Sequence, residues 1–188
     1  MGGGDKALLQ LGGKPMLKRV VDRLAPQCSR VILNANGDPA RFSSLSLPVI
    51  ADGVQGFAGP LAGVLAGLEW AAREAPETQH IVTLAADTPF APRDLVERLA
   101  EVRQRAGATI AVAASGGRRH HVVALWPIEL AGPVRRALVD EGVRKVEAFA
   151  DRYPVAMAEW AAEPEDPFFN VNTPEDFAAA EARLSSRR

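Results

Sequence analysis

Apolar and polar positions follow one another along this chain in two alternating patterns. Near-continuous apolar runs at residues 30–34 and 80–86 are typical of strands that are covered on both faces. Between them, apolar positions such as Leu61, Leu65 and Leu68 recur at helical spacing. The full pattern predicts helices at about 15–25, 59–74, 92–107, 128–139, 142–151 and from 173, and further strands at about 48–51, 108–113, 122–126 and 155–160.

Strands that alternate with helices in this way predict an α/β domain with a mainly parallel sheet. No repeat, low-complexity tract or long linker divides the chain, so residues 1–188 are interpreted as one domain. In such sheets, ligands bind beyond the carboxyl ends of the strands. Polar residues that follow the predicted strands are therefore the first candidates for a functional site.

Composition narrows the class of protein. Of the 188 residues, 47% are hydrophobic and 24% are charged, which suits one globular domain with a proper core. A formal net charge of -1 gives no general reason to expect nucleic acid or a membrane as a partner. The single cysteine, Cys28, excludes an internal disulfide and suggests a reducing compartment. With no zinc-ligand spacing, no membrane-spanning run and no signal pattern, we expect a cytoplasmic protein.

Two segments have the chemistry of a phosphate and metal site. In Gly3-Gly4-Asp5-Lys6, the glycines let backbone N–H groups approach phosphate oxygens, and the lysine adds a positive charge. A flexible terminus with a solvated lysine is the alternative. Asp87 directly follows the second apolar run, where a carboxylate can hold Mg²⁺ between the phosphates of a nucleotide. An aspartate that caps the next turn is the alternative there.

Further polar segments fit the recognition of a nucleotide. Asn34 and Asp52 follow predicted strands and can hydrogen-bond a base edge or a ribose. Small residues around Gly59 would let a ring lie against the backbone. Asn172 precedes a predicted helix N-terminus, which could serve an anion or a metal-bound phosphate. Ordinary loop polarity, a helix start and a structural turn remain alternatives for each segment alone.

The order of these motifs strongly resembles that of the molybdenum cofactor guanylyltransferases. The family pattern closes its glycine-rich loop with M-G-G-x-D-K and continues with N-A-N, an aspartate, G-P-L-A-G, D-T-P and N-V-N-T-P-E. The matching segments of this chain are residues 1–6, 34–36, 52, 59–63, 87–89 and 170–175. The resemblance implies a three-layer α/β/α, Rossmann-like nucleotidyltransferase domain. It also implies an enzyme that transfers GMP from GTP to molybdopterin and releases pyrophosphate.

The resemblance assigns roles residue by residue. Lys6 and Asp87 are the catalytic candidates, and Mg²⁺ is the implied cofactor. Related sugar-nucleotide transferases use the position of Asn172 to help hold the metal. The residues expected to bind the GTP phosphates are Gly3, Gly4 and Lys6, and those expected to bind guanosine are Asn34, Asp52 and Gly59. Asp87 and Asn172 are expected to bind Mg²⁺, and Asp87 also contacts the nucleotide.

The second implied substrate is molybdopterin or Mo-molybdopterin, which carries an anionic phosphate. The nearby cations Arg118, Arg119, Arg144 and Lys145 are candidates to bind it, and a solvated charged face is the alternative. His120 lies in a stretch similar to a family H-P-V-x-A-L-W segment, and a hydrogen-bonded structural residue is an equal reading. Implied protein partners are upstream cofactor-biosynthesis enzymes or chaperones of the recipient molybdoenzymes.

Two other functions stay open at this point. One is cytidylyl transfer to the same pterin, although the Asp5-Lys6 pairing and the segment 170–172 favour the guanylyl branch. The other is a non-catalytic nucleotide-binding module that lacks a complete active loop. In the family pattern a strand and the first half of the loop precede the position of Met1. We therefore expect the biological chain to begin about 15–25 residues upstream, the length of a strand plus its loop.

Overall fold

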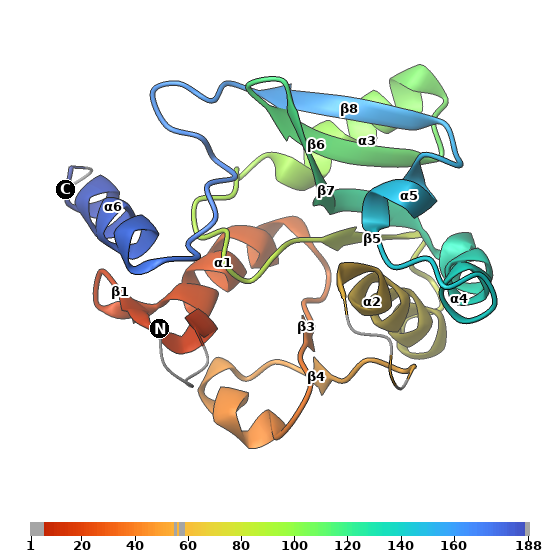
Figure 1. Ribbon diagram of the computed structural model, residues 1–188, viewed down its shortest axis with the longest axis horizontal. Coiled ribbons are helices and arrows are strands. Elements are labelled where there is room, and N and C mark those ends of the chain that lie inside the picture. The colour runs from red at the N-terminus through yellow and green to blue at the C-terminus, as the bar shows by residue number, and fades with distance from the viewer. Residues whose placement is uncertain (1–5, 55, 57–58, 187–188) are drawn as a thin grey trace.

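The computed structural model describes residues 6–54, 56 and 59–186. Its centre is a four-stranded sheet made, in spatial order, of β5 (His80–Thr83), β7 (Arg118–Pro127), β6 (Ile110–Ser115) and β8 (Val155–Trp160) (Figure 1). β7 is antiparallel to β5 and to β6, whereas β6 and β8 are parallel. β5, β6 and β8 therefore run in one direction, as predicted for a mainly parallel sheet, and β7 runs against them.

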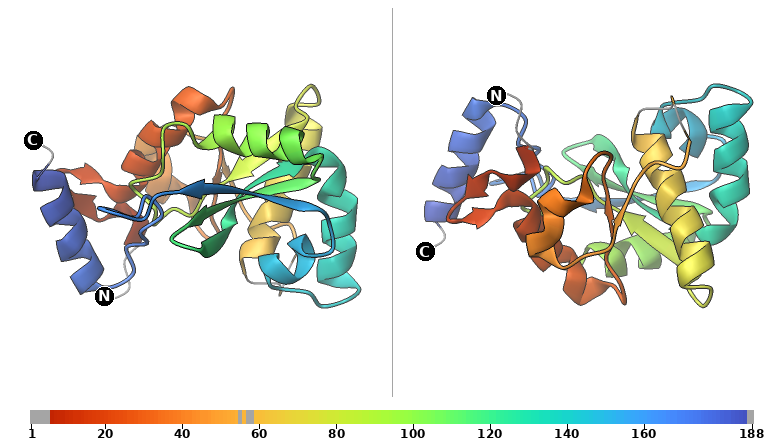
Figure 2. Two further views of the ribbon diagram at one scale, coloured as in Figure 1. Left: turned by 90° about the horizontal axis from the view of Figure 1, so that it is seen from above. Right: turned by 90° about the horizontal axis from the view of Figure 1, so that it is seen from below.

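Helices cover both faces of this sheet, which confirms the three-layer α/β/α arrangement (Figure 2). Alternate side chains of β6 face opposite layers, with Ile110 and Val112 in one core and Ala111 and Ala113 in the other. A strand in this position needs apolar residues throughout, and all six residues of β6 are buried. The first core contains α2 (Pro60–Glu74), α4 (Ala131–Val139) and α5 (Val146–Ala150), and the second contains α3 (Leu95–Ala106).

The N-terminal hairpin and the C-terminal helix lie side by side (Figure 1). The hairpin consists of β1 (Gln10–Leu11) and β2 (Lys14–Pro15), and α1 (Met16–Leu24) follows it. Its turn residues Gly12 and Gly13 have φ angles of 57° and 74°, which favour glycine. The Gly12 N–H donates a 2.6 Å hydrogen bond to Glu181 Oε1 of α6 (Pro174–Ser185). This contact ties the segments that carry Lys6 and Asn172 to each other.

Two predicted strands differ from expectation in burial and extent. In the segment 30–34 only β3 (Leu33–Asn34) is a strand, and it pairs with β4 (Val49–Ile50) in a separate two-stranded sheet. All residues of 30–34 are half-buried or exposed, so the prediction of a buried strand there is wrong. β5 is an edge strand whose four residues are half-buried, so it is not covered as predicted. Among the described residues, β3 and β5 each pair with a strand on one side only, which leaves both runs at sheet edges.

The other predicted elements are present with shifted ends. α3 begins at Leu95 instead of Pro92, α4 is preceded by a short 3₁₀ turn at Ile128–Leu130, and α5 is shorter than the predicted 142–151. A 3₁₀ segment at Pro39–Leu45 joins β3 to β4. Across the described parts of the chain, no helix has the length and apolarity that a bilayer crossing requires.

Candidate active site

Lys6, Asp87 and Asn172 meet at one place from distant parts of the sequence. The Lys6 Nζ donates a 2.6 Å hydrogen bond to Asn172 Oδ1 and lies 3.8 Å from Asp87 Oδ2. The Lys6 and Asp87 side chains are 33% and 22% exposed, so solvent reaches the pair. The structure therefore brings together the predicted catalytic and metal-binding residues. The predictions for Gly3 and Gly4 fall outside the described residues.

Backbone contacts hold Asp87 and Asn172 next to each other. The Asp87 carbonyl, just beyond β5, accepts a 2.9 Å hydrogen bond from the Val171 N–H. Val171 is fully buried in a small core with Leu11 and Phe90. Its neighbours Asn170 and Asn172 are exposed, as expected for alternating side chains in an extended segment. Burial of Val171 thus turns Asn172 outward, towards Lys6.

One oxygen of the Asp87 carboxylate has no hydrogen-bond partner among the residues that the structure describes. Oδ1 is buried and unpaired, while Oδ2 faces Lys6. An unsatisfied buried polar atom costs about 1–3 kcal/mol, and more when charged, so a site that keeps one is suited to a ligand that pairs with it. Carboxylate and amide oxygens beside solvent fit Mg²⁺, which takes one or two protein carboxylates and retains waters. Within the described residues no cluster of three or more His, Cys, Asp or Glu forms a closed metal cage.

Asn34 and Asp52 form a second polar cluster at the ends of β3 and β4. Asn34 Nδ2 donates to Asp52 Oδ1 at 3.0 Å, and Asn36 Nδ2 donates to Asp52 Oδ2 at 2.7 Å. Asn36 Oδ1 also accepts the Asp52 N–H at 2.9 Å. Asn36 belongs to the N-A-N motif, but the sequence analysis predicted no function for it. Its two hydrogen bonds with Asp52 show that it orients the carboxylate.

Glycines at the start of α2 allow the helix to approach this cluster. A Cβ at Gly63 would lie 2.6 Å from Asn34 Oδ1, closer than any real contact, so glycine permits the approach. Gly59 precedes the helix with a φ of 138°, which also favours glycine. A Cβ there would lie 3.8 Å from the Arg144 carbonyl, so the loop before α5 adjoins the start of α2. Gly59 shapes the turn, and Gly63 seats the helix against Asn34.

The two polar clusters are neighbours across a shared apolar support. Ala7, Ala35 and Ala86, which are adjacent in sequence to Lys6, Asn34 and Asp87, all pack against one core cluster. That cluster is built on Leu17, Phe42 and Leu45. The three segments that carry Lys6, Asn34 and Asp87 therefore rest on one apolar support.

The N-terminus of α6 is already occupied by its own carboxylate. Asp176 Oδ2 accepts the N–H groups of Asn172 and Thr173 at 2.9 and 2.8 Å, and Thr173 Oγ1 accepts the Asp176 N–H. The bonds from Asn172 and then Thr173 hold the pKa of Asp176 below its usual value. The predicted capping box is confirmed. The N–H groups of Asn172 and Thr173 are thus engaged by this carboxylate, whereas the Asn172 side chain faces Lys6.

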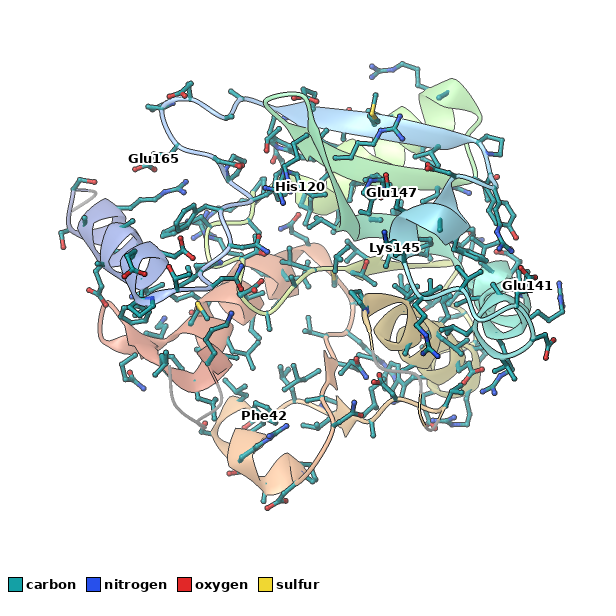
Figure 3. The ribbon with its side chains drawn as sticks, in the orientation of Figure 1. Phe42, His120, Glu141, Lys145, Glu147 and Glu165 are labelled. Carbon is teal, nitrogen blue, oxygen red and sulfur yellow. The ribbon has the colours of Figure 1, made fainter. Side chains whose placement is uncertain are left out.

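His120 of β7 belongs to a hydrogen-bonded group with Ser115, the last residue of β6, and Asp166, which lies between β8 and α6 (Figure 3). Ser115 Oγ lies 2.8 Å from Asp166 Oδ1 and 2.7 Å from His120 Nε2. The hydroxyl has one proton, which it donates to Asp166, so it accepts a hydrogen bond from His120 Nε2–H. Burial lowers the pKa of His120 and favours the neutral ring. The reading of His120 as a hydrogen-bonded structural residue therefore fits, and its ring also packs 4.7 Å from that of Phe168.

The cations considered for the pterin substrate have different surroundings. Arg119 lies 3.5 Å from Asp151 and contacts Met157 Sδ at 3.1 Å. Arg144 and Lys145 are exposed on the loop that adjoins Gly59. Figure 3 shows Lys145 close to Glu147 in front of the sheet. Arg144 and Lys145 are thus the two of these cations whose loop borders the candidate nucleotide site.

Solved structures with the same architecture place the fold in a known class. A molybdopterin-guanine dinucleotide biosynthesis protein A from Archaeoglobus fulgidus has a TM-score of 0.74 at 23% identity, over 98% of this chain and 92% of its own. A Mycobacterium tuberculosis H37Rv protein in complex with manganese has a TM-score of 0.70 at 21% identity, over 96% and 90% of the two chains. The chain therefore shares the fold of these proteins.

The family follows from the sequence matches. Residues 1–163 match the model of the MobA-like NTP transferase domain. The chain is 59% identical over 181 residues to a molybdenum cofactor guanylyltransferase of Rhodopseudomonas palustris (strain HaA2), a match that covers 96% of this chain and 85% of the relative. The chain belongs to this family of nucleotidyltransferase enzymes, which confirms the family and enzyme class predicted from its motifs.

Proposed function

We propose that this protein transfers GMP from GTP to the phosphate of molybdopterin or Mo-molybdopterin, forming the guanine dinucleotide cofactor and pyrophosphate. The observation that carries the proposal is the group formed by Lys6, Asp87 and Asn172, with its buried unpaired carboxylate oxygen. A relative 59% identical to the chain bears the name of this activity. The segment that carries the exposed Asn34–Asp52 cluster rests on the same apolar support as that group, which supports a nucleoside site there.

The reaction joins two anions. An oxygen of the pterin phosphate forms a bond to the α-phosphorus of GTP, and the bond from that phosphorus to the bridging oxygen breaks. The electron pair leaves with pyrophosphate. Charge neutralisation and alignment are the main needs of such a transfer, because the attacking oxygen is already ionised near neutral pH. Lys6 provides a positive charge beside Asp87, and no serine or cysteine nucleophile is required.

Asp87, with the Asn172 side-chain oxygen, would hold Mg²⁺ at this site. Bound there, Mg²⁺ would neutralise phosphate charge and fix the orientation of the nucleotide. Lys6 Nζ stands between the two oxygen ligands in the structure and compensates the carboxylate charge. With Asn172 engaged by the ion, Lys6 would be available to bind the GTP phosphates. The structural neighbour in complex with manganese supports a divalent ion in this fold.

Asn34 and Asp52 are proposed to bind the guanosine, with Gly59 against its ring. Asn36 holds the Asp52 carboxylate in place, so the pair is ordered before the nucleotide arrives. Arg144 and Lys145, on the loop that borders Gly59, are proposed to bind the anionic pterin. A cytoplasmic location and contacts with upstream enzymes or molybdoenzyme chaperones stay predictions.

Substitution of Gly63 by alanine should weaken the affinity for GTP about 10-fold, which is the effect of losing roughly one hydrogen bond. The new Cβ would lie 2.6 Å from Asn34 Oδ1 and would push this amide away from Asp52. Titration with GTP measures the change. The matched control is the same substitution made together with Asn34→Ala, which should bind no more weakly than Asn34→Ala alone. An unchanged affinity of the single variant would contradict the role of Asn34.

The test of the function is a competition between nucleotides. Purified protein, Mg²⁺ and molybdopterin are mixed with GTP, CTP or both, and pyrophosphate release and the dinucleotide mass are measured. We expect the guanine dinucleotide, at least about 100-fold preference for GTP as for a site that hydrogen-bonds its base, and loss of turnover in EDTA. A cytosine dinucleotide would identify a cytidylyltransferase. Binding of GTP without any turnover would identify a non-catalytic module.

A further inference from the structure

The segment between β8 and α6 carries Asn172 and is anchored from two sides at Asp166. The Asp166 carbonyl accepts a 2.8 Å hydrogen bond from Arg183 Nη1–H of α6. Asp166 Oδ1 accepts the Ser115 hydroxyl at 2.8 Å and the Phe168 N–H at 2.9 Å. Asp166 therefore joins the segment both to α6 and to the end of β6.

Ser115 can hold Asp166 because its hydroxyl receives a second hydrogen bond from His120. Ser115 is 3% exposed, so its hydroxyl depends on partners within the protein. His120 Nε2–H donates to it at 2.7 Å, which leaves the single hydroxyl proton for Asp166. The carboxylate thus binds the serine and not the histidine, and no base removes the serine proton. The group holds a position and does not form a nucleophile.

A β-bulge in β7 turns His120 towards the end of β6. The ladder pairs Ala113 with His120, although an uninterrupted register would place Val123 there. The hydroxyl of Thr83 donates to the Val122 carbonyl in the bulge at 2.7 Å. Bulges beside functional sites redirect side chains in this way. Because Thr83 belongs to β5, the strand that leads to the candidate metal site also supports this group.

The segment that runs on from Asp166 is packed along its length. Phe168 is 2% exposed, and the centre of its ring lies 4.7 Å from that of the β7 imidazole. Val171 is fully buried, and its N–H donates to the Asp87 carbonyl. Since Asn172 directly follows Val171, a displacement at Asp166 would also move the Asn172 side chain.

We propose that Asp166 is a positioning residue, which Ser115 and His120 hold so that it sets the place of Asn172 at the metal site. The proposal rests on the proposed function, because it takes Asn172 as a ligand of the ion. A metal ligand needs support from neighbouring hydrogen bonds, and the loss of such support costs about 10- to 100-fold in metal affinity. Asp166 acts through Asn172, so its removal has no further effect once the Asn172 side chain is gone.

The test is a double-mutant cycle on the affinity for Mn²⁺, measured by electron paramagnetic resonance on the whole chain without nucleotide. Ser115→Ala and Asp166→Ala should each weaken binding about 10-fold. In the Asn172→Ala background, both substitutions should change the affinity less than about 2-fold, because the ligand that they position is absent. Additive losses would overturn the proposal, since they would show that Asp166 does not act through Asn172.

Asp166→Asn separates positioning from charge. The amide oxygen can still accept the hydrogen bonds of the Ser115 hydroxyl and the Phe168 N–H, so this variant should bind Mn²⁺ within about 3-fold of the parent. A loss as large as that of Asp166→Ala would overturn the proposal, because the carboxylate charge would then act on the ion itself. Ser185→Ala removes an exposed hydroxyl that donates to the Glu181 carbonyl of its own helix. It is the matched control for Ser115→Ala and should leave the affinity unchanged.

Amide hydrogen exchange gives a readout without the metal ion. Ser115→Ala should speed exchange of the Val171 amide about 10-fold, because the hydrogen bond of this amide to the Asp87 carbonyl loses its support. The Ala35 amide, which is bonded to the Ile50 carbonyl, is the internal control. Unchanged exchange at Val171 would overturn the proposal.

The single variants separate this proposal from the proposed function. If Asn172→Ala bound Mn²⁺ as tightly as the parent, Asn172 would not be a metal ligand, and the positioning role would fall with that part of the proposed function. A loss of Mn²⁺ affinity in Asn172→Ala without a loss in Ser115→Ala would overturn the positioning role alone.

Discussion

Asp87→Asn is expected to lower the rate of GMP transfer about 1000-fold while leaving the fold intact. The substitution keeps the shape of the side chain and the backbone hydrogen bond from Val171 to the Asp87 carbonyl. It removes the negative charge that would hold Mg²⁺, and a metal ion contributes several kcal/mol to charge stabilisation in such a transfer. Steady-state turnover measures the loss, and thermal unfolding measures stability.

The stability readout separates a functional residue from a structural one. Within the described residues Oδ1 of Asp87 is buried without a hydrogen bond, and the ion pair of Oδ2 with Lys6 is long at 3.8 Å and open to solvent, so removal of the charge should cost little stability. We expect a melting temperature close to that of the parent. Glu97→Gln, which removes an exposed carboxylate from α3 on a distant face, is the matched control and should retain full activity. Near-normal GMP transfer by Asp87→Asn would rule out Asp87 as the metal ligand.

Local signals predicted the parts of the fold that depend on neighbouring residues. The start of α2 at Pro60 and the cap of α6 by Thr173 and Asp176 are encoded within a few positions, and both are present. The buried strand β6 also follows from its continuous apolar run. The environment of β5 does not follow from its own residues, because an apolar strand is buried only if other strands lie beside it.

The candidate site was predictable as a set of residues but not as a geometry. The motif order selected Lys6, Asp87 and Asn172, yet the hydrogen bond from Lys6 to Asn172 spans 166 positions and depends on the packing of α6 against the hairpin. The sequence also assigned the N-terminus of α6 to an anion, although the capping residue Asp176 competes for the same N–H groups. The contact between Ser115 and Asp166 has no local signal, because it joins residues that only the fold brings together.

Lys6→Ala is expected to reduce GMP transfer about 100- to 1000-fold, the usual effect of removing one charged or hydrogen-bonding group aimed at a transition state. The ammonium lies 3.8 Å from the Asp87 carboxylate and donates a hydrogen bond to Asn172, so it stands directly at the candidate site. The backbone of residue 6 accepts the Leu9 N–H, and alanine preserves this bond. Turnover is measured together with the affinity for Mn²⁺, used as a spectroscopic probe, in the absence of nucleotide.

The affinity for Mn²⁺ decides how Lys6 acts. If the lysine binds phosphates and only stands between the metal ligands in the free enzyme, Lys6→Ala loses turnover but binds Mn²⁺ as tightly as the parent or more tightly, because a repelling charge is gone. Asp87→Asn should lose both. Lys14→Ala removes another N-terminal lysine, whose partner Asp22 lies 2.7 Å away in a surface pair, and should change neither. Normal turnover by Lys6→Ala, or a parallel loss of Mn²⁺ binding, would contradict a role on the phosphates.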